Sequence, residues 1–124
     1  MELLIALATT GLVLKHGKMT EIKVGHSSIW YTFNDGEFRS DGKSFVDLKT
    51  LKTPADKRGS GAGRAAMEHF LKMVDKAGIE VRLEAAPMDA QTKAAKLVKF
   101  YKTFGFVSKG RGANGETLMI RKPQ

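Results

Sequence analysis

The stretch Lys57–Arg64 reads KRGSGAGR, with a glycine at positions 59, 61 and 63 and a basic residue at each end. Glycine costs about 1 kcal/mol relative to alanine in a helix interior, so this run is a poor start for a helix. A helical apolar pattern nevertheless follows over Ala62–Ala77, with Ala66, Phe70 and Val74 on one stripe. Two hypotheses explain the glycines: a slack surface loop, or a loop whose bare amides approach a ligand closely.

Strands and helices alternate on both sides of this stretch. Strands are expected wherever apolar residues alternate between turn residues, and helices wherever they recur every three to four residues. Gly78 and Gly105 stand where the two helices are expected to end, and Asp89 is a candidate cap at the start of the second. No repeat or linker interrupts the pattern, which predicts one domain over residues 1–124. The expected strands are Glu21–Gly25, Ser28–Asn34, Ser44–Thr53, Ile79–Ala85, Phe106–Lys109 and Glu116–Arg121, and the second helix carries Ala94, Leu97, Val98 and Tyr101 on one face.

The strand before the glycine stretch contains a slip in its apolar phase. Val46 and Leu48 are two residues apart, whereas Leu51 is three residues further on. One extra residue in a period-two pattern predicts a β-bulge, and bulges often splay a strand near a site. The alternative is a strand that ends near Leu48.

Composition limits the function classes. The 124 residues are 42% apolar and 27% charged, which is ordinary for a globular protein. There is no cysteine, which excludes disulfides, thiolate nucleophiles and zinc–thiolate sites and favours a reducing, cytoplasmic location. Leu3–Leu14 is apolar but shorter than the roughly 20 residues that span a bilayer, and Glu2 is unlike a signal peptide's basic start. We expect this segment to be a buried helix or strand, without a membrane role.

Positive charge is confined to the second half of the chain. Residues 1–56 carry seven basic and seven acidic side chains, whereas residues 57–124 carry 14 basic and six acidic ones and hold the whole net charge of +8. Such an excess attracts cofactor phosphates, nucleic acid or an acidic protein surface. A solvated basic face without a dedicated partner is the alternative.

The glycine stretch stands between a strand and the first turn of a helix, where unpaired amides and the helix dipole favour an anion. The glycine spacing matches neither the P-loop nor the G-x-G-x-x-G dinucleotide pattern. It does match R-x-x-G-x-G, over Arg58–Gly63. A second motif, FYKTFGF over Phe100–Phe106, closes the second expected helix.

These two motifs, in this order, resemble the pyrophosphate loop and the F-Y-x-x-x-G-F signature of the GCN5-related N-acetyltransferase (GNAT) family. The resemblance covers about Ser44–Arg121. It implies an α/β (α+β) fold: a mixed, mostly antiparallel central sheet flanked by helices, with a bulged strand before a glycine-rich pyrophosphate loop. It also implies acetyl transfer from acetyl-CoA, without a metal, to a primary amine by direct attack, the amine being a protein lysine, an N-terminus or a small molecule.

The chain departs from the family pattern in three places. The spacer before Arg58 is one residue longer than usual, and Ala94 stands where many members carry an asparagine. The amino-terminal region lacks room for the usual pair of helices that cover the acceptor, which implies a more open acceptor site. Short members of this kind act on protein lysines, so the resemblance makes a protein acceptor one of the candidates.

Carried onto this sequence, the resemblance implies three groups of site residues. Tyr101 is the candidate acid that protonates the leaving thiolate, and Asp47, Glu84 and Asp89 are candidates for the base. His26 and Trp30 are candidates for the acceptor side. For each of these side chains, a packing or solvent-facing role is the alternative. The candidate cofactor-binding residues are Leu51, Lys52, Thr53, Arg58, Gly59, Ser60, Gly61, Ala62, Gly63 and Arg64.

Two other functions stay open from the sequence. A basic nucleic-acid-binding module would use the lysine row of the second helix, because a row of cations can follow a phosphate backbone. A catalytically inactive relative that only binds CoA would keep the glycine loop. The sequence leaves both monomer and homodimer open. The basic residues of the first alternative are Lys93, Lys96, Lys99, Lys102, Lys109, Arg111, Arg121 and Lys122.

Overall fold

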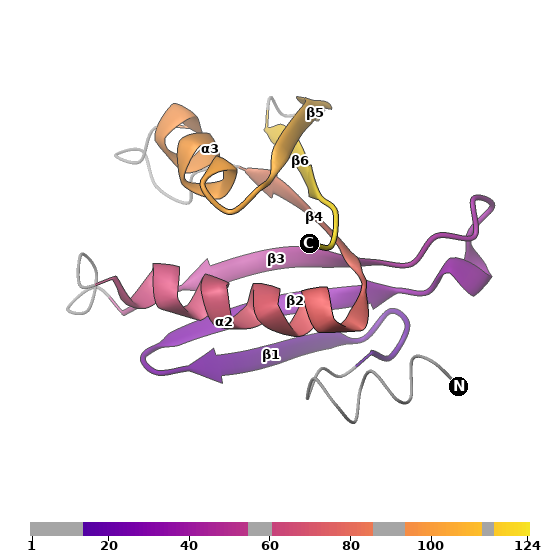
Figure 1. The fold of residues 1–124 in the computed structure, drawn as a ribbon, viewed down its shortest axis with the longest axis horizontal. Helices are drawn as coiled ribbons and strands as arrows, with labels where there is room; N and C mark the ends of the chain where they lie inside the picture. The colour runs from indigo at the N-terminus through magenta and orange to yellow at the C-terminus, as the bar shows by residue number, and fades with distance from the viewer. Residues whose placement is uncertain (1–13, 55–60, 86–93, 113–115) are drawn as a thin grey trace.

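The computed structural model describes residues 14–54, 61–85, 94–112 and 116–124. Figure 1 shows a sheet with the strand order β1-β2-β3-β4-β6-β5 and two helices, α2 and α3. Strands β3 and β4 pair in parallel, and the other neighbours pair antiparallel, which confirms the expected fold class. The elements are β1 Met19–Val24, β2 Ser27–Asn34, the 3₁₀ turn η1 Gly36–Phe38, β3 Phe45–Lys52, α2 Ala62–Ala77, β4 Glu80–Ala85, α3 Ala94–Lys102, β5 Val107–Arg111 and β6 Thr117–Arg121.

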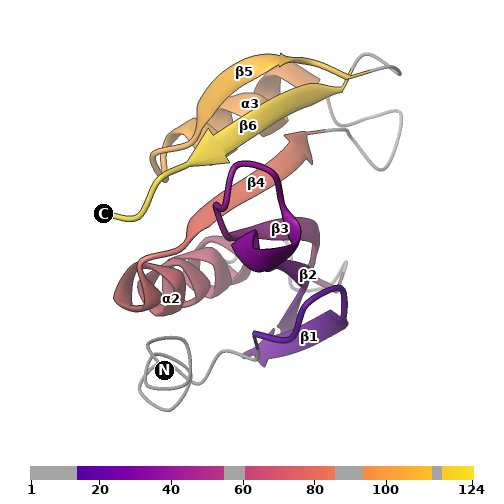
Figure 2. The ribbon, with the colours of Figure 1, turned by 90° about the vertical axis from the view of Figure 1, so that its right-hand side faces the viewer.

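Both helices cover the same face of the sheet. Every second residue of β2 is buried on that face, and the Tyr31 ring packs on Phe70 of α2 with 5.4 Å between centroids. Tyr101 of α3 joins the same apolar core. In Figure 2, α2 lies beside β3 and β4, and α3 lies behind β5 and β6. The side chains between the buried ones point to the opposite face, which we call the outer face; Trp30 and Asp47 lie on it. No helix among the described residues covers the outer face.

Strand β3 contains the expected bulge. Its antiparallel register with β2 shifts between Trp30 and Tyr31, which face Thr50 and Leu48 respectively. Lys49 is therefore the extra residue, and β3 continues beyond Leu48 to Lys52. The alternative of a strand that ends near Leu48 is wrong, because β3 keeps its hydrogen bonds to β2 on the far side of the bulge.

The expected element boundaries differ from the structure where helices end. Helix α2 has the expected bounds, and Gly78 ends it in the left-handed conformation at φ 69°. The Ile79 amide then donates to the Val74 carbonyl, so β4 begins one residue later than expected. The Phe106 amide likewise donates back to Tyr101, and β5 begins at Val107. Among the described helices, none is both long and apolar enough to cross a membrane.

An ion pair joins α2 to the last strand. Arg121 donates to both carboxylate oxygens of Asp75, at 2.6 and 2.9 Å, and to the Phe104 carbonyl at 2.7 Å. The Arg121 side chain is only 5% exposed. Burial by itself would raise the pKa of the Asp75 carboxyl, but hydrogen bonds from Arg121 and the Gln124 amide, with the Arg121 charge, hold that pKa below its ordinary value. Strand β6, which lies between β4 and β5, and α2 are thus held together by an ion pair whose guanidinium is buried.

We expect Asp75→Ala to lower the free energy of unfolding by about 3–5 kcal/mol, because it leaves a buried guanidinium unpaired. Urea unfolding at pH 7 measures this. Glu68→Ala, an exposed position on the same helix, is the matched control and should change stability by less than about 0.5 kcal/mol. Since the folded-state pKa of Asp75 is lowered, its contribution is complete above the ordinary value of about 3.9 and disappears as pH falls through the lower folded-state value. Equal stabilities of Asp75→Ala and Glu68→Ala would contradict the role given to the pair.

Candidate active site

The parallel strands β3 and β4 separate at the bulge. Their pairing runs from Phe45 opposite Glu80 to Leu48 opposite Leu83 and stops there. Both strands continue, β3 to Lys52 and β4 to Ala85, and Figure 1 shows them diverging toward the side where α2 begins. Beyond Leu48, β3 therefore has a strand partner on its β2 side only, among the described residues. Its backbone groups that face β4 are available to a ligand.

The first turn of α2 lies against the end of β3. Gly61 caps the helix in the left-handed conformation at φ 85°, and no side chain in the described segments caps this end. A Cβ atom built on Gly63 would lie 3.5 Å from Thr53 Oγ1 and 3.8 Å from Leu51 Cδ2. Thr53 Oγ1 is itself 2.7 Å from the Ser27 hydroxyl, which fixes the end of β3 to β2. The fold thus brings together the two expected cofactor-binding segments, the end of β3 and the start of the helix.

The two described glycines of this loop differ in backbone conformation. Gly61 has a positive φ, which glycine adopts without strain. Gly63 has an ordinary helical backbone. A Cβ atom at position 63 would make only ordinary van der Waals contact with Thr53 and Leu51, so these neighbours do not by themselves require glycine there. The candidate residues Arg58, Gly59 and Ser60, and the candidate base Asp89, lie outside the described residues.

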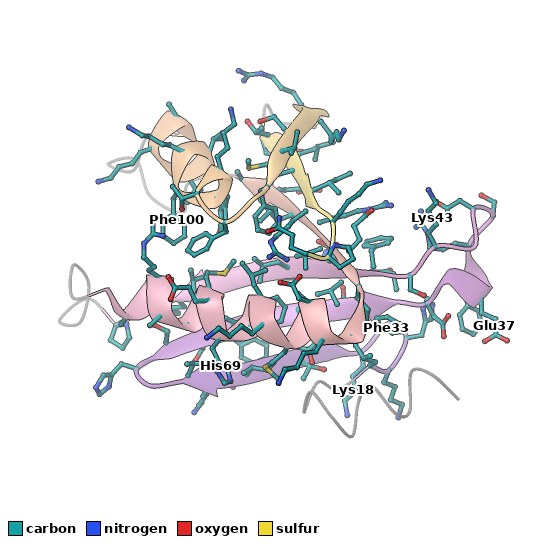
Figure 3. All side chains as sticks on the ribbon, viewed as in Figure 1. Lys18, Phe33, Glu37, Lys43, His69 and Phe100 are labelled. Carbon is teal, nitrogen blue, oxygen red and sulfur yellow. The ribbon has the colours of Figure 1, made fainter. Side chains whose placement is uncertain are left out.

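Arg64 links the two helices. Its guanidinium donates to Thr103 Oγ1 at 3.1 Å and lies 4.7 Å from the Phe104 ring centroid and 5.4 Å from that of Phe100. Figure 3 shows Phe100 on the side of α3 that faces α2. The cation therefore lies between the start of α2 and the end of α3, beside the separated strands. Its role toward a pyrophosphate stays a prediction.

Tyr101 is largely buried on the helix-covered face. Its ring makes edge contacts with Phe100 and Phe106, at 5.4 and 5.6 Å between centroids. Burial raises the pKa of its hydroxyl above the ordinary value, so the group keeps its proton at neutral pH. No hydrogen bond joins that hydroxyl to another residue of the described segments, which leaves the proton available to a bound group.

The carboxylate candidates lie on the outer face. Asp47 of β3 and Glu84 of β4 flank the point where the strands separate, and both line a hollow of about 240 Å³. Apolar side chains form much of the hollow, whereas Arg82 and Lys109 add positive charge. Arg82 is paired with Glu80 at 2.6 Å, and Asp47 with Lys49 at 2.7 Å. The apolar lining residues are Phe45, Leu83, Leu118, Met119 and Ile120.

The two acceptor-side candidates, Trp30 and His26, do not share one site as Asp47 and Glu84 do. Trp30 lies on the outer face opposite Thr50, near the bulge, whereas His26 is exposed in the turn between β1 and β2. Sequence reasoning missed Lys49 and Arg82, and it considered Lys109 only for nucleic-acid binding. The phase slip located the bulge but not its extra residue, and only the pairing of β4 with β6 shows which basic side chains share a face.

The described lysines of the α3 row are exposed, as a nucleic-acid-binding module would require. One other basic residue proposed for that module, Arg121 of β6, is buried. Lys96, Lys99 and Lys102 are exposed, and the last two line a hollow of about 580 Å³ with Arg111. Arg121 is buried against Asp75, so the expectation that it follows a phosphate backbone is wrong. Lys93 lies outside the described residues. No group of three metal-ligating side chains occurs in the described segments.

Comparison with known proteins identifies the fold. No family model and no curated protein matches the chain. Among solved structures, the anti-CRISPR protein AcrVA5 matches with a TM-score of 0.62 and 18% identity, over 82% of this chain and 96% of its own. Arabidopsis thaliana Naa50, in complex with the bisubstrate analogue CoA-Ac-MVNAL, gives 0.58 and 24%, over 77% and 64%. Tetrahymena GCN5 gives 0.60 and 16%, over 86% and 68%. With strands that separate at a bulge beside a glycine-capped helix, the chain has the GCN5-related N-acetyltransferase fold that its two motifs predicted.

Proposed function

We propose that the protein is an N-acetyltransferase that moves the acetyl group of acetyl-CoA to a primary amine. The observation that carries this proposal is the separation of β3 and β4 at the bulge, directly beside the first turn of α2. A similar fold binds the bisubstrate analogue CoA-Ac-MVNAL in Naa50. The separated strands and the helix end offer backbone groups for the thioester arm and amides for the pyrophosphate.

The chain's own residues fit acetyl-CoA at this place. Leu51, Lys52 and Thr53 would donate and accept through backbone groups on the side of the gap between β3 and β4. Amides of the loop up to Arg64 would hold the pyrophosphate, since the left-handed Gly61 leaves open space where a side chain would stand. Arg64 lies close enough to add charge from the α3 side. This arrangement uses no metal.

The two faces of the sheet would receive the two substrates. Tyr101 lies on the helix-covered face, whereas Asp47 and Glu84 lie on the outer face at the same gap. An amine entering from the outer face would meet a carboxylate before it meets the thioester. Asp47 or Glu84 would then take its proton, directly or through water, as the nitrogen attacks the carbonyl carbon. Tyr101 would protonate the departing thiolate, because its hydroxyl keeps its proton at neutral pH.

The acceptor class is left as a protein lysine, a protein N-terminus or a small-molecule amine. Calorimetry with acetyl-CoA, followed by mass spectrometry of a lysate incubated with the protein and labelled acetyl-CoA, tests the proposal. Binding of acetyl-CoA together with the appearance of labelled, acetylated amines supports the proposal. Binding of acetyl-CoA without any turnover would identify a relative that only binds CoA. Absence of binding would overturn it.

We expect Gly61→Val and Gly63→Val to abolish acetyl-CoA binding, measured by calorimetry. Gly61→Val should also lose about 1–2 kcal/mol of stability, because its backbone is left-handed. Gly78→Val is the matched control: it is equally left-handed, at φ 69° with open space around it, but ends the same helix far from the site. The control should lose similar stability and keep its affinity. Unchanged affinity in both loop variants would rule out the amide cradle.

We expect Tyr101→Phe to lower kcat by at least about tenfold while the acetyl-CoA Kd and the thermal stability stay nearly unchanged, because it removes the proton and keeps the packed ring. Tyr31→Phe, in the core against α2, is the matched control and should keep kcat. Steady-state kinetics with an amine found in the lysate experiment measures both. Turnover of Tyr101→Phe at the parental rate would assign Tyr101 to the core alone.

A further inference from the structure

We propose that Lys49 is an internal acceptor, which the protein acetylates on itself when no external amine occupies the site; this inference rests on the proposed function. Lys49 is the extra residue of the β3 bulge, directly after the last residue of β3 that pairs with β4. The place where the thioester would lie therefore begins at Lys49.

The side chain of Lys49 lies on the side from which an acceptor would come. Its ammonium is 2.7 Å from Asp47 Oδ2, and Asp47 lines the hollow on the outer face. This contact has the same form as the one expected between an acceptor ammonium and its base. Lys49 thus occupies, from within the chain, the place of an incoming amine.

Tethering makes this amine a strong competitor. The Lys49 amine and the place proposed for the thioester both lie at the bulge. Well-oriented intramolecular groups reach effective concentrations of about 10⁵–10⁸ M. Both side chains are partly exposed, at 44% for Lys49 and 28% for Asp47, so the pair is held weakly and the ammonium can leave the carboxylate.

The chemistry balances with acetyl-CoA as the sole co-substrate. Lys49 Nζ loses a proton to Asp47 and attacks the thioester carbonyl carbon. The N–C bond forms, the C–S bond breaks, and CoA leaves as a thiolate that takes up a proton. The ammonium nitrogen starts with three protons and the amide keeps one: the first proton lost reaches the solvent through Asp47, and the second balances the one that the thiolate takes up. The product lysine is neutral and no longer pairs with Asp47.

The test uses the full chain with acetyl-CoA and no added amine, followed by intact mass and peptide mapping. We expect one acetyl group on Lys49, at a rate independent of protein concentration. Lys49→Arg keeps a cation beside Asp47 and should take up no acetyl group. Lys23→Arg, an exposed position of β1, is the matched control and should be modified like the parent. Asp47→Asn should slow the modification by at least about tenfold.

Four outcomes would overturn the inference: Lys49 left unmodified, acetyl groups spread equally over exposed lysines such as Lys109, a rate proportional to protein concentration, or an unchanged rate in Asp47→Asn. The proposed function is tested separately by acetyl-CoA affinity and by external amines. Turnover of external amines with Lys49 unmodified removes this inference alone, whereas no binding of acetyl-CoA removes the function on which it rests.

Discussion

The structure depends on the β-bulge in β3, which adds one residue, Lys49, to that strand. A β-strand pairs on both sides only while its two ladders stay in phase, and Lys49 ends that agreement. On the β2 side the hydrogen bonds resume beyond the bulge, as far as Lys52 opposite Ser28. On the β4 side they stop at Leu48. The sheet is thereby continuous at one end and divided at the other, without any break in the chain.

Among the described residues, the divided sheet leaves β3 without a strand partner on its β4 side beyond Leu48, and the rest of the fold determines what lies beside that side. Helix α2 connects β3 to β4 and begins at the divided end, because a parallel pair needs a long crossover connection. Its first turn, which no side chain of the described residues caps, therefore lies at the same gap. The ion pair between Asp75 and Arg121 fixes the other end of α2 to β6, where the sheet is continuous. The end of the sheet where β3 and β4 pair thus anchors α2, whose first turn lies at the end where they separate.

Most of this arrangement was predictable from local patterns. The bounds of α2 followed from its apolar stripe and Gly78, and the bulge followed from the spacing of Val46, Leu48 and Leu51. The helix and the bulge are local in sequence, so their signals are too. The grouping of Asp47 with Glu84 was expected from neighbouring strands, but the identity of Lys49 as the extra residue required the register with β2.

Long-range partners explain what the sequence could not show. Arg121 belongs to the basic half of the chain by composition, yet its partner Asp75 is 46 residues away and buries it. Arg64 was expected to face a phosphate, and that role stays a prediction. The sequence did not show that its guanidinium also contacts two aromatic rings and a threonine at the end of α3 and just after it. A count of charges does not distinguish a solvated cation from a paired one, because the difference lies in which strand or helix packs against it.

The division of the sheet also separates two kinds of chemistry. The helix-covered face holds an aromatic hydroxyl that burial keeps protonated, and the outer face holds carboxylates beside cations. A candidate proton donor and the candidate proton acceptors thus lie on opposite faces of one sheet. In the proposed reaction the attacking amine would lose a proton on the outer face, and the departing thiolate would gain one on the helix-covered face. Acyl transfer to an amine needs both proton movements, so the proposed function gives each face of the sheet a separate role.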